Sequence, residues 1–428
     1  MKRYGRRIAP LLAAALLLAG CSAGMKEASL SPAGTPAGTA IPLRLMAYNG
    51  ISARFTYLAF LSGKLPGIRV EYDAVPLDYY SSTLSGQLLS GSGPDIIELG
   101  GETRLLAGAG RLMDLTGQPF IQKYTQEGLL PYSVAGRVYA VPLQSWFEGM
   151  YYNKDIFEKY GLNPPRNFEE FISLHKTLKS LGIKAQIMGA QSWEPLMKQS
   201  IALVNSEFYA NPKNDGFDAA FDKGEATLEG SWLPAVTLWS QMISEGCLTP
   251  DMLSYSYEQA MEEFALGKAA MWQSGPWSLN EILRINPNIR LGMFPIPGTK
   301  EDEGWLVGGP GSALAISANS KNKQAAIDVL AATATIDAQK ALITDSKGLS
   351  YVSSVETDLG PVFDGCVNAI EKGHVYAPWT TAWSYGNPVV EAYGKALQEV
   401  LAGTKTIAQA LHDANEVNSK LRSAIGGP

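Results

Sequence analysis

The chain has 428 residues and a formal charge of −6 at pH 7, from 35 Lys and Arg against 41 Asp and Glu. Hydrophobic residues make up 46% of the chain and charged residues 18%, which is typical of an ordered globular protein and excludes a disordered one. The acidic balance, without basic clusters, argues against nucleic acid or an anionic membrane surface as the main partner.

The N-terminus joins a basic start to a short apolar run. Four basic residues lie within residues 1–7, and residues 8–20 are almost purely apolar. This run is too short for the ~30 Å hydrocarbon of a bilayer but suits a signal peptide. It ends in Leu-Ala-Gly followed by Cys21, which is similar to a bacterial lipobox. We therefore expect cleavage after residue 20 and a lipid on Cys21 as the only membrane anchor, with an ordinary secretory signal as the alternative.

Residues 22–40 are rich in Ser, Ala, Gly, Thr and Pro, and they cannot bury enough apolar surface to offset the entropy lost on ordering. We predict a flexible tether with a typical span of about 25 Å between the lipid and the folded body. Two further cysteines, Cys247 and Cys366, are expected to be buried and unpaired, although a disulfide is allowed outside the cytoplasm.

From residue 43 onward, short β-rich runs alternate with helical patterns. The β-rich runs are at 43–47, 68–72, 95–99, 138–141, 149–152, 269–273 and 313–316. Between them, N-cap signals at Asn167, Ser256 and Thr406 each precede apolar residues at helical spacing. Strands alternating with helices imply βαβ units and mostly parallel sheets. At ~100–200 residues per domain, a chain of this length is expected to form two lobes.

Catalytic and metal-binding motifs are few. The three histidines, His175, His374 and His412, are far apart and lack metal-binding spacing, so neither a zinc site nor a Ser-His-Asp triad is expected. The chain has no glycine motif for phosphates or dinucleotides, and no cofactor is predicted. A glycosidase stays open as an alternative, because it needs only two facing carboxylates, which sequence spacing does not reveal.

Tryptophan is the most informative residue type, with nine in the chain. Trp232 and Trp239 lie seven apart at helical spacing and are expected in the core. Trp146 and Trp277 lie beside turn signals instead. A further group crowds one short segment: Trp379, Trp383 and Tyr385. Because an aromatic ring offers a flat apolar face that suits the C–H face of a sugar ring, these positions point to carbohydrate binding.

Several short motifs follow one another along the chain in a recognisable order. They are Gly93–Ile96, Gly136–Pro142, Met150–Asp155, Tyr160–Pro165, Phe264–Met271, Gly275–Trp277, Gly308–Gly309 and Ala313–Ile316. This order resembles the family-1 extracellular solute-binding proteins, the group that includes maltose-binding protein, over nearly all of residues 42–428. One departure is at Leu349–Tyr351, where the family usually places a Pro after the glycine.

The resemblance implies a two-lobed α/β fold in which hinge strands join the lobes and a solute binds in the cleft between them. The implied divisions are 1–20 for the signal peptide, 21–41 for the lipidated cysteine and tether, 42–152 and 307–350 for lobe 1, and 153–306 and 351–428 for lobe 2. The implied crossings between the lobes are near Asn153–Asp155, Trp305–Gly309 and Ser350.

The resemblance also implies where the ligand binds. Trp277 matches a motif position whose ring commonly stacks on a sugar, and Trp383, with Trp379 and Tyr385, matches the aromatic cluster before the last helices. Further candidates lie at strand ends or before the hinge strand, because open α/β sheets bind ligands beyond the carboxyl ends of their strands. These are Tyr48, Asn49, Glu98, Gly100, Trp146 and Glu148, with Trp193 added although its segment has no clear motif.

The residues and the resemblance together predict a lipid-anchored, extracytoplasmic protein that binds a sugar or oligosaccharide and delivers it to the permease of an ABC importer. It is expected to be a monomer without enzymatic activity, on the outer face of the cytoplasmic membrane of a Gram-positive bacterium. The alternatives are the same fold binding an amino acid, a phosphate ester or a polyamine, an extracellular glycoside hydrolase, and a lipoprotein that scaffolds or senses through a partner.

Overall fold

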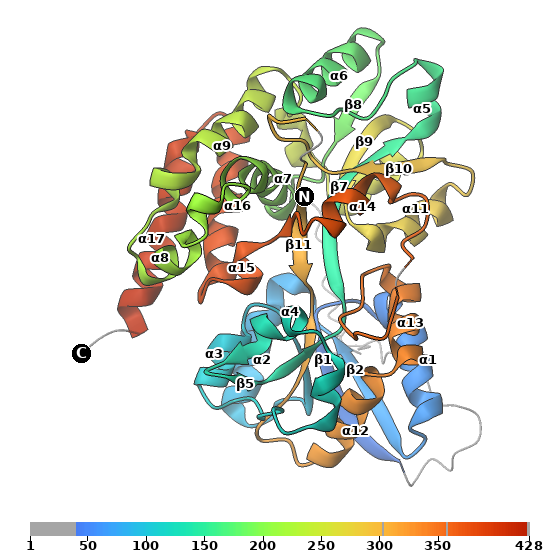
Figure 1. Cartoon of the computed structure of the whole chain (residues 1–428), viewed down its shortest axis with the longest axis vertical. Coiled ribbons are helices and arrows are strands. Elements are labelled where there is room, and N and C mark those ends of the chain that lie inside the picture. The colour runs from blue at the N-terminus through green and yellow to red at the C-terminus, as the bar shows by residue number, and fades with distance from the viewer. Residues whose placement is uncertain (1–39, 302–303, 357, 426–428) are drawn as a thin grey trace, which may run out of the picture.

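The computed structural model describes residues 40–301, 304–356 and 358–425, so the expected signal peptide, the lipidated Cys21 and most of the tether lie outside the described residues. Two α/β lobes, each with one main sheet, lie one below the other in Figure 1. The two-lobed α/β fold predicted from the sequence is confirmed. Among the described residues, no helix is long and apolar enough to span a membrane.

Lobe 1 is built on a five-stranded sheet with the order β2, β1, β3, β12, β6. The strands are β1 (Ile41–Ala47), β2 (Ile68–Ala74), β3 (Ile96–Leu99), β6 (Ala140–Pro142) and β12 (Ala313–Ile316). The helices of this lobe are α1 (Phe55–Lys64), α2 (Leu77–Ser90), α3 (Thr103–Gly108), α4 (Gln126–Leu129), α12 (Lys323–Thr333) and α13 (Ile336–Ser346). A short hairpin pairs β4 (Ser133–Val134) with β5 (Arg137–Val138).

Successive residues of β1 face opposite layers of helices. Leu43 and Leu45 pack into a core with α1, α12 and α13, whereas Met46 packs into a second core with α2 and α3. This alternation follows from the two-residue period of a strand, and a sheet covered on both faces requires strands that are apolar throughout. β12 meets that requirement with four buried apolar residues, and β3 does so except for Glu98, whose buried charge is paired with Arg54.

Lobe 2 is built on a six-stranded sheet with the order β13, β11, β7, β9, β8, in which β10 also pairs with β7. The strands are β7 (Ser145–Asn153), β8 (Lys184–Ile187), β9 (Ala269–Ser274), β10 (Leu291–Phe294), β11 (Leu306–Pro310) and β13 (Val375–Tyr376). β8 and β9 are parallel, but β7 is antiparallel to β9, β10 and β11. In lobe 1, β12 is likewise antiparallel to β3 and β6, so each main sheet mixes parallel and antiparallel pairs and the expectation of mostly parallel sheets is wrong.

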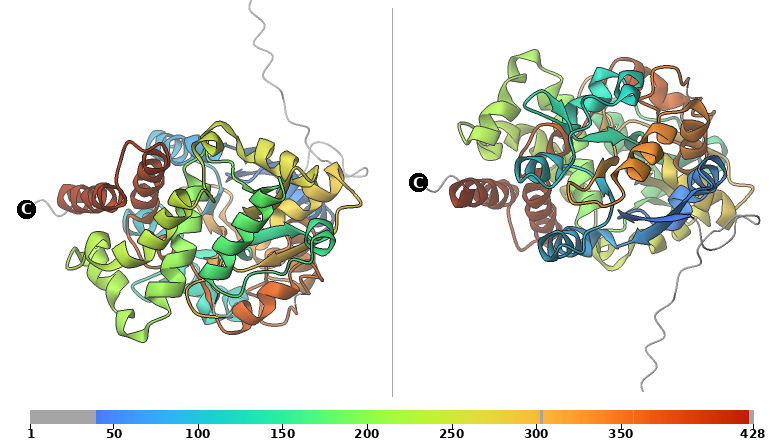
Figure 2. Two further views of the ribbon diagram at one scale, coloured as in Figure 1. Left: turned by 90° about the horizontal axis from the view of Figure 1, so that it is seen from above. Right: turned by 90° about the horizontal axis from the view of Figure 1, so that it is seen from below.

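Helices cover the lobe 2 sheet and extend to one side of it (Figures 1 and 2). They are α5 (Lys154–Lys159), α6 (Phe168–Ser180), α7 (Glu194–Val204), α8 (Phe217–Lys223), α9 (Leu228–Ser244), α10 (Tyr257–Ala265), α11 (Leu279–Ile285), α14 (Asp364–Glu371), α15 (Pro378–Thr381), α16 (Gly386–Leu401) and α17 (Ile407–Ile425). As predicted, Trp232 and Trp239 are fully buried in their core. Cys247 and Cys366 are both buried and free, which confirms that expectation.

The predicted N-caps are present. The Asn167 side chain accepts a hydrogen bond from a backbone N–H of the first turn of α6, and Ser256 forms a full capping box with Gln259 before α10. Thr406 accepts from the backbone N–H of Gln409 at the start of α17. Each cap satisfies an N–H group that has no partner within its own helix, which fixes where the helix begins.

Three segments connect the lobes. β7 and β11 run between them as an antiparallel pair (Figure 1). The third connection follows Val352, which packs in the lobe 1 core, and precedes Phe363, which packs in the lobe 2 core. The chain therefore leaves lobe 1 a few residues beyond the expected position near Ser350.

Candidate ligand-binding site

Three indole rings meet at the end of lobe 2 that faces lobe 1. Trp146 lies near the start of β7, Trp277 follows β9 in a short 3-10 turn, and Trp379 lies in α15. The Trp146 ring centroid is 6.4 Å from that of Trp277 and 5.9 Å from that of Trp379. Trp146 and Trp277 are each half-buried, so part of each ring is accessible. The structure thus brings together three of the aromatic residues expected to bind ligand.

The Gly275-Pro276-Trp277 sequence has a steric basis. A Cβ atom at Gly275 would lie 2.0 Å from the Trp277 ring, so only glycine lets the indole fold back over the chain at this point. The indole N–H donates to the Tyr257 hydroxyl at 3.0 Å, and that hydroxyl also bonds to the hydroxyls of Ser274 and Ser278. The ring of Trp277 is therefore held in one orientation by its own turn and by α10.

A buried lysine lies against two of these rings. Lys198, on α7, has its Nζ 4.9 Å from the Trp146 ring centroid and 5.7 Å from that of Trp277. The same nitrogen forms ion pairs with Glu148 at 2.6 Å and with Glu194 at 2.9 Å. Cation–π contacts of this kind strengthen as the cation is desolvated, and the Lys198 side chain is only 11% exposed. We call Lys198, Glu148, Glu194 and Gln273 the junction cluster.

Opposing effects set the charges in this cluster. Burial alone would lower the pKa of Lys198, but the carboxylates of Glu148 and Glu194 outweigh it and raise that pKa above its ordinary value. Burial raises the pKa of Glu148, and the Lys198 ammonium acts against that rise. Because the ammonium is 2.6 Å from Glu148, we assign both groups as charged near neutral pH.

Gln273, at the end of β9, completes the cluster. Its Nε2 donates to Glu148 at 3.3 Å, which fixes the amide orientation because a carboxylate only accepts hydrogen bonds. Its Oε1 is buried and accepts no hydrogen bond from any described residue. A buried acceptor without a partner is costly, so this atom would gain from a hydrogen bond to any donor group that reached it.

Lobe 1 contributes the residues at the ends of β1 and β3. Asn49 donates to Glu98 at 2.6 Å, and Arg54 forms a buried ion pair with the same Glu98 oxygen at 2.8 Å. Glu98 is fully buried and thus anchors this corner of lobe 1. Tyr48 is half-buried with its ring edge-on to Tyr80, and burial raises its pKa well above the ordinary value.

Direct contacts join the two lobes beside the indoles. Glu102 accepts a hydrogen bond from the Asn387 side chain at 2.9 Å, and Arg104 donates to the Ala382 carbonyl at 3.0 Å. A Cβ at Gly101 would lie 3.2 Å from the Trp379 carbonyl oxygen, so the backbone after Gly100 closely approaches α15. Residues from both lobes therefore surround the junction at which the indoles meet.

The remaining expected site residues lie elsewhere. Trp383 is 3% exposed, its N–H donates to Asp218 at 2.8 Å, and its ring packs on Phe221 and Trp232 in the helical core. Trp193 packs against Gly394 of α16. Tyr385 is half-buried at the N-terminus of α16 and packs against the lobe 2 core. The structure does not bring the rings of Trp383 and Trp193 into the indole group at the junction.

Sequence reasoning missed Lys198, Glu194 and Gln273. A signal for two of them was present, because residues 196–204 of α7 are otherwise almost wholly apolar or small and every one of them is buried. A lysine in such a stretch, with a glutamate four residues earlier, indicates a buried charge that needs a partner. No comparable signal marks Gln273.

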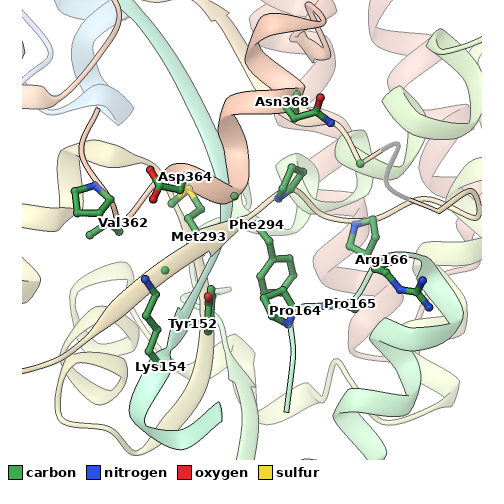
Figure 3. A pocket seen from close by; sticks show the side chains of 17 residues that line it. Tyr152, Lys154, Pro164, Pro165, Arg166, Met293, Phe294, Val362, Asp364 and Asn368 are labelled. Atoms are coloured by element: carbon green, nitrogen blue, oxygen red, sulfur yellow. The ribbon is translucent and has the colours of Figure 1, made fainter. Parts of the chain in front are cut away.

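A separate pocket of about 270 Å³ lies on lobe 2 where β10 meets α14 (Figure 3). Tyr152, Lys154, Phe294 and Asp364 are among its lining residues. None of the expected site residues lines it. Over the described part of the chain, no group of three His, Cys, Asp or Glu residues could hold a metal ion.

Two α/β lobes joined by strands, with aromatic and charged residues at their junction, define the class of two-lobed binding proteins. The family model of bacterial extracellular solute-binding proteins matches residues 56–340, and the chain belongs to this family. Membership implies an extracytoplasmic location and a solute-binding role.

Individual relatives agree with this assignment. The multiple sugar-binding protein of Streptococcus mutans is 27% identical over 261 residues, which is 60% of this chain and 62% of that relative, so the match spans less than two thirds of its length. A family 1 extracellular solute-binding protein from Bifidobacterium longum subsp. infantis has a TM-score of 0.69 at 23% identity, with 90% of this chain and 100% of that chain covered. A sugar transporter protein from Bacillus licheniformis in complex with stachyose has a TM-score of 0.71 at 18% identity, covering 89% and 100%.

Proposed function

We propose that this protein binds a sugar or oligosaccharide at the junction of its lobes and delivers it to the permease of an ABC importer. The observation that carries this proposal is the pair of half-buried indoles, Trp146 and Trp277, beside the buried polar groups of the junction cluster. Indole faces suit the C–H faces of a sugar, and adjacent acceptors suit its hydroxyls. The sugar-binding names of the relatives support the same class of ligand.

Binding by lobe closure gives the mechanism. A ligand that contacts both lobes favours the closed arrangement by its differential affinity for the closed and open forms. In this proposal the ligand would contact the indoles and the junction cluster from lobe 2, and Tyr48, Asn49 and Gly100 from lobe 1. The permease would then distinguish loaded from empty protein by the relative position of the lobes.

The indole contact is tested by Trp277→Ala. We expect the variant to lose ~1–3 kcal/mol of binding free energy, as typical for a truncated stacking residue, measured by isothermal titration against the tightest neutral oligosaccharide of a thermal-shift panel. Trp305→Ala is the matched control, because Trp305 stacks on His374 in lobe 2 and is not among the junction indoles. An unchanged dissociation constant for Trp277→Ala would remove this ring from the site.

The same panel separates the alternatives. A sugar that stabilises the protein and is recovered intact supports a binding protein, since a ligand at a hundredfold excess over Kd raises stability by about 2.7 kcal/mol. A sugar recovered cleaved would indicate a glycoside hydrolase. If no sugar shifts the melting temperature, amino acids, phosphate esters and polyamines become the next ligands, and no small-molecule binding at all would favour a scaffolding or sensing role.

We further propose that Cys21 carries a lipid and holds the protein, as a monomer, on the outer face of the cytoplasmic membrane of a Gram-positive cell. The basic and apolar segments before Cys21 support this proposal. Cys21→Ala should abolish incorporation of a labelled fatty acid and release the protein from the membrane fraction. Membrane retention of the unlipidated variant would contradict a lipid as the only anchor.

A further inference from the structure

The charged groups at the lobe junction carry a net negative charge. Lys198 contributes one positive charge, and its two partners, Glu148 and Glu194, contribute two negative charges. From the loops in contact across the lobes, Glu102 and Arg104 add one charge of each sign. The buried Arg54–Glu98 pair adds none. Counted over these residues, the junction therefore holds one more negative than positive charge.

The charge of Lys198 is already offset by two carboxylates. Of its three N–H donors, two point to carboxylate oxygens at 2.6 and 2.9 Å, and the ammonium also lies over two indole faces. A carboxylate or phosphate on a ligand would have to compete with Glu148 and Glu194 for this ammonium, or take its one remaining N–H beside both of them. It would otherwise lie among like charges in a poorly solvated site, where repulsion is weakly screened.

The hydrogen-bonding groups of the cluster that remain free are acceptors, not donors. The buried Oε1 of Gln273 accepts no hydrogen bond, and its orientation is fixed by the contact between Nε2 and Glu148. Glu194 is the accessible carboxylate, with its side chain 36% exposed against 6% for Glu148. A ligand is therefore offered acceptors, and sugar hydroxyls supply the donors that acceptors require.

We propose that Glu194, by neutralising Lys198 and adding a second carboxylate, makes this site selective for neutral carbohydrate and excludes sugars that carry a carboxylate or phosphate. This inference rests on the proposed function, since it assigns the substrate class of the same site. Glu194 is a specificity-determining residue in this scheme, and Lys198 serves to hold both carboxylates beside the indoles.

The test compares a neutral sugar with its anionic counterpart in wild type and variants. Raffinose, stachyose and maltotriose are titrated calorimetrically alongside the same sugars oxidised to a carboxylate at a C6 position. We expect the wild type to bind a neutral member at least roughly a hundredfold more tightly than its carboxylate form, because like-charge contacts are strongly unfavourable. Glu194→Gln should reduce this ratio of dissociation constants roughly tenfold or more.

Two variants keep the result interpretable. Glu194→Asp retains the charge and should retain the discrimination, which a purely steric role of the side chain would not predict. Glu391→Gln removes a carboxylate from another i,i+4 pair with lysine, on the exposed face of α16, and should leave the ratio at the wild-type value.

Each outcome decides the inference. A wild type that binds neutral and carboxylate forms equally, or a Glu194→Gln ratio equal to that of the wild type, would overturn it while leaving sugar binding intact. Tighter binding of the carboxylate forms would overturn it as well. If no sugar of either kind binds, the proposed function itself fails and this inference falls with it.

Discussion

His175 is a buried histidine with one unsatisfied nitrogen. It lies on α6 with its Nδ1 2.8 Å from the Phe171 carbonyl, which only accepts, so Nδ1 carries the proton and the buried Nε2 has no partner among the described residues. Burial lowers its pKa from 6.5 to about 4. The proposed function does not use this side chain, so we expect its titration to affect the stability of the fold.

This shift predicts how stability depends on pH. Between pH 7 and pH 4 the unfolded chain binds a proton at this histidine that the folded chain resists, so the free energy of unfolding falls as pH falls. The expected contribution over this window is about 3 kcal/mol. Urea titrations of wild type and His175→Gln at several pH values give the free energy of unfolding at each pH. The contribution of His175 is the difference between the two proteins in the slope of this free energy against pH. Equal slopes in the two proteins would contradict the assignment.

At the scale of elements, the β7–β11 pair tolerates little added volume. A Cβ at Gly308 would lie 2.2 Å from the Trp146 carbonyl oxygen and 2.7 Å from the Phe147 Cα, and both of these are backbone atoms. Backbone atoms cannot move aside as a flexible side chain can. Gly308 therefore allows β11 to lie against β7 at the start of the strand that carries Trp146.

Gly308→Ala should consequently destabilise the protein by ~1–3 kcal/mol, as typical for overpacking, and lower the melting temperature in calorimetry. Gly63→Ala is the matched control, because a Cβ there meets no atom within 4 Å and lies in the α1 helix. Alanine is the better helix former, so that variant should be neutral or more stable by up to ~1 kcal/mol. An unchanged melting temperature for Gly308→Ala would show that the strand pair can separate locally.

At the scale of the whole molecule, the Glu102–Asn387 hydrogen bond helps to set the relative position of the lobes. It joins α3 of lobe 1 to α16 of lobe 2 beside the indoles, and the Arg104 contact with Ala382 lies next to it. Because contacts of this kind tie one lobe to the other, they favour a closed arrangement, and a solute that contacts both lobes would add to them.

Asn387→Ala should shift the unliganded protein toward an open arrangement. Loss of a hydrogen bond to a charged acceptor at a half-exposed position is worth about 1 kcal/mol, which is roughly a fivefold change in the ratio of open to closed forms. Small-angle X-ray scattering should report it as a larger radius of gyration without ligand. Asn368→Ala, an exposed change on α14, is the control and should leave the radius at the wild-type value.

Local features of this protein follow from the sequence. The caps at Asn167, Ser256 and Thr406 and the burial of Trp232 and Trp239 depend on residues within one or two helical turns, and all were predicted correctly. The order of short motifs also indicated the two-lobed fold, because each motif forms a strand, turn or helix start whose neighbours in the fold are set by the family's topology.

Only the tertiary structure decided which side chains meet. Trp277 and Trp383 both lie in turn-like segments, yet one joins the indoles at the junction and the other bonds to Asp218 in the helical core. Glu148 and Lys198 are 50 residues apart and pair because β7 and α7 meet at one end of lobe 2. The physical reason is that caps and helical periodicity are short-range along the chain, whereas ring contacts and ion pairs between distant residues are set by segments that come together only in the folded molecule.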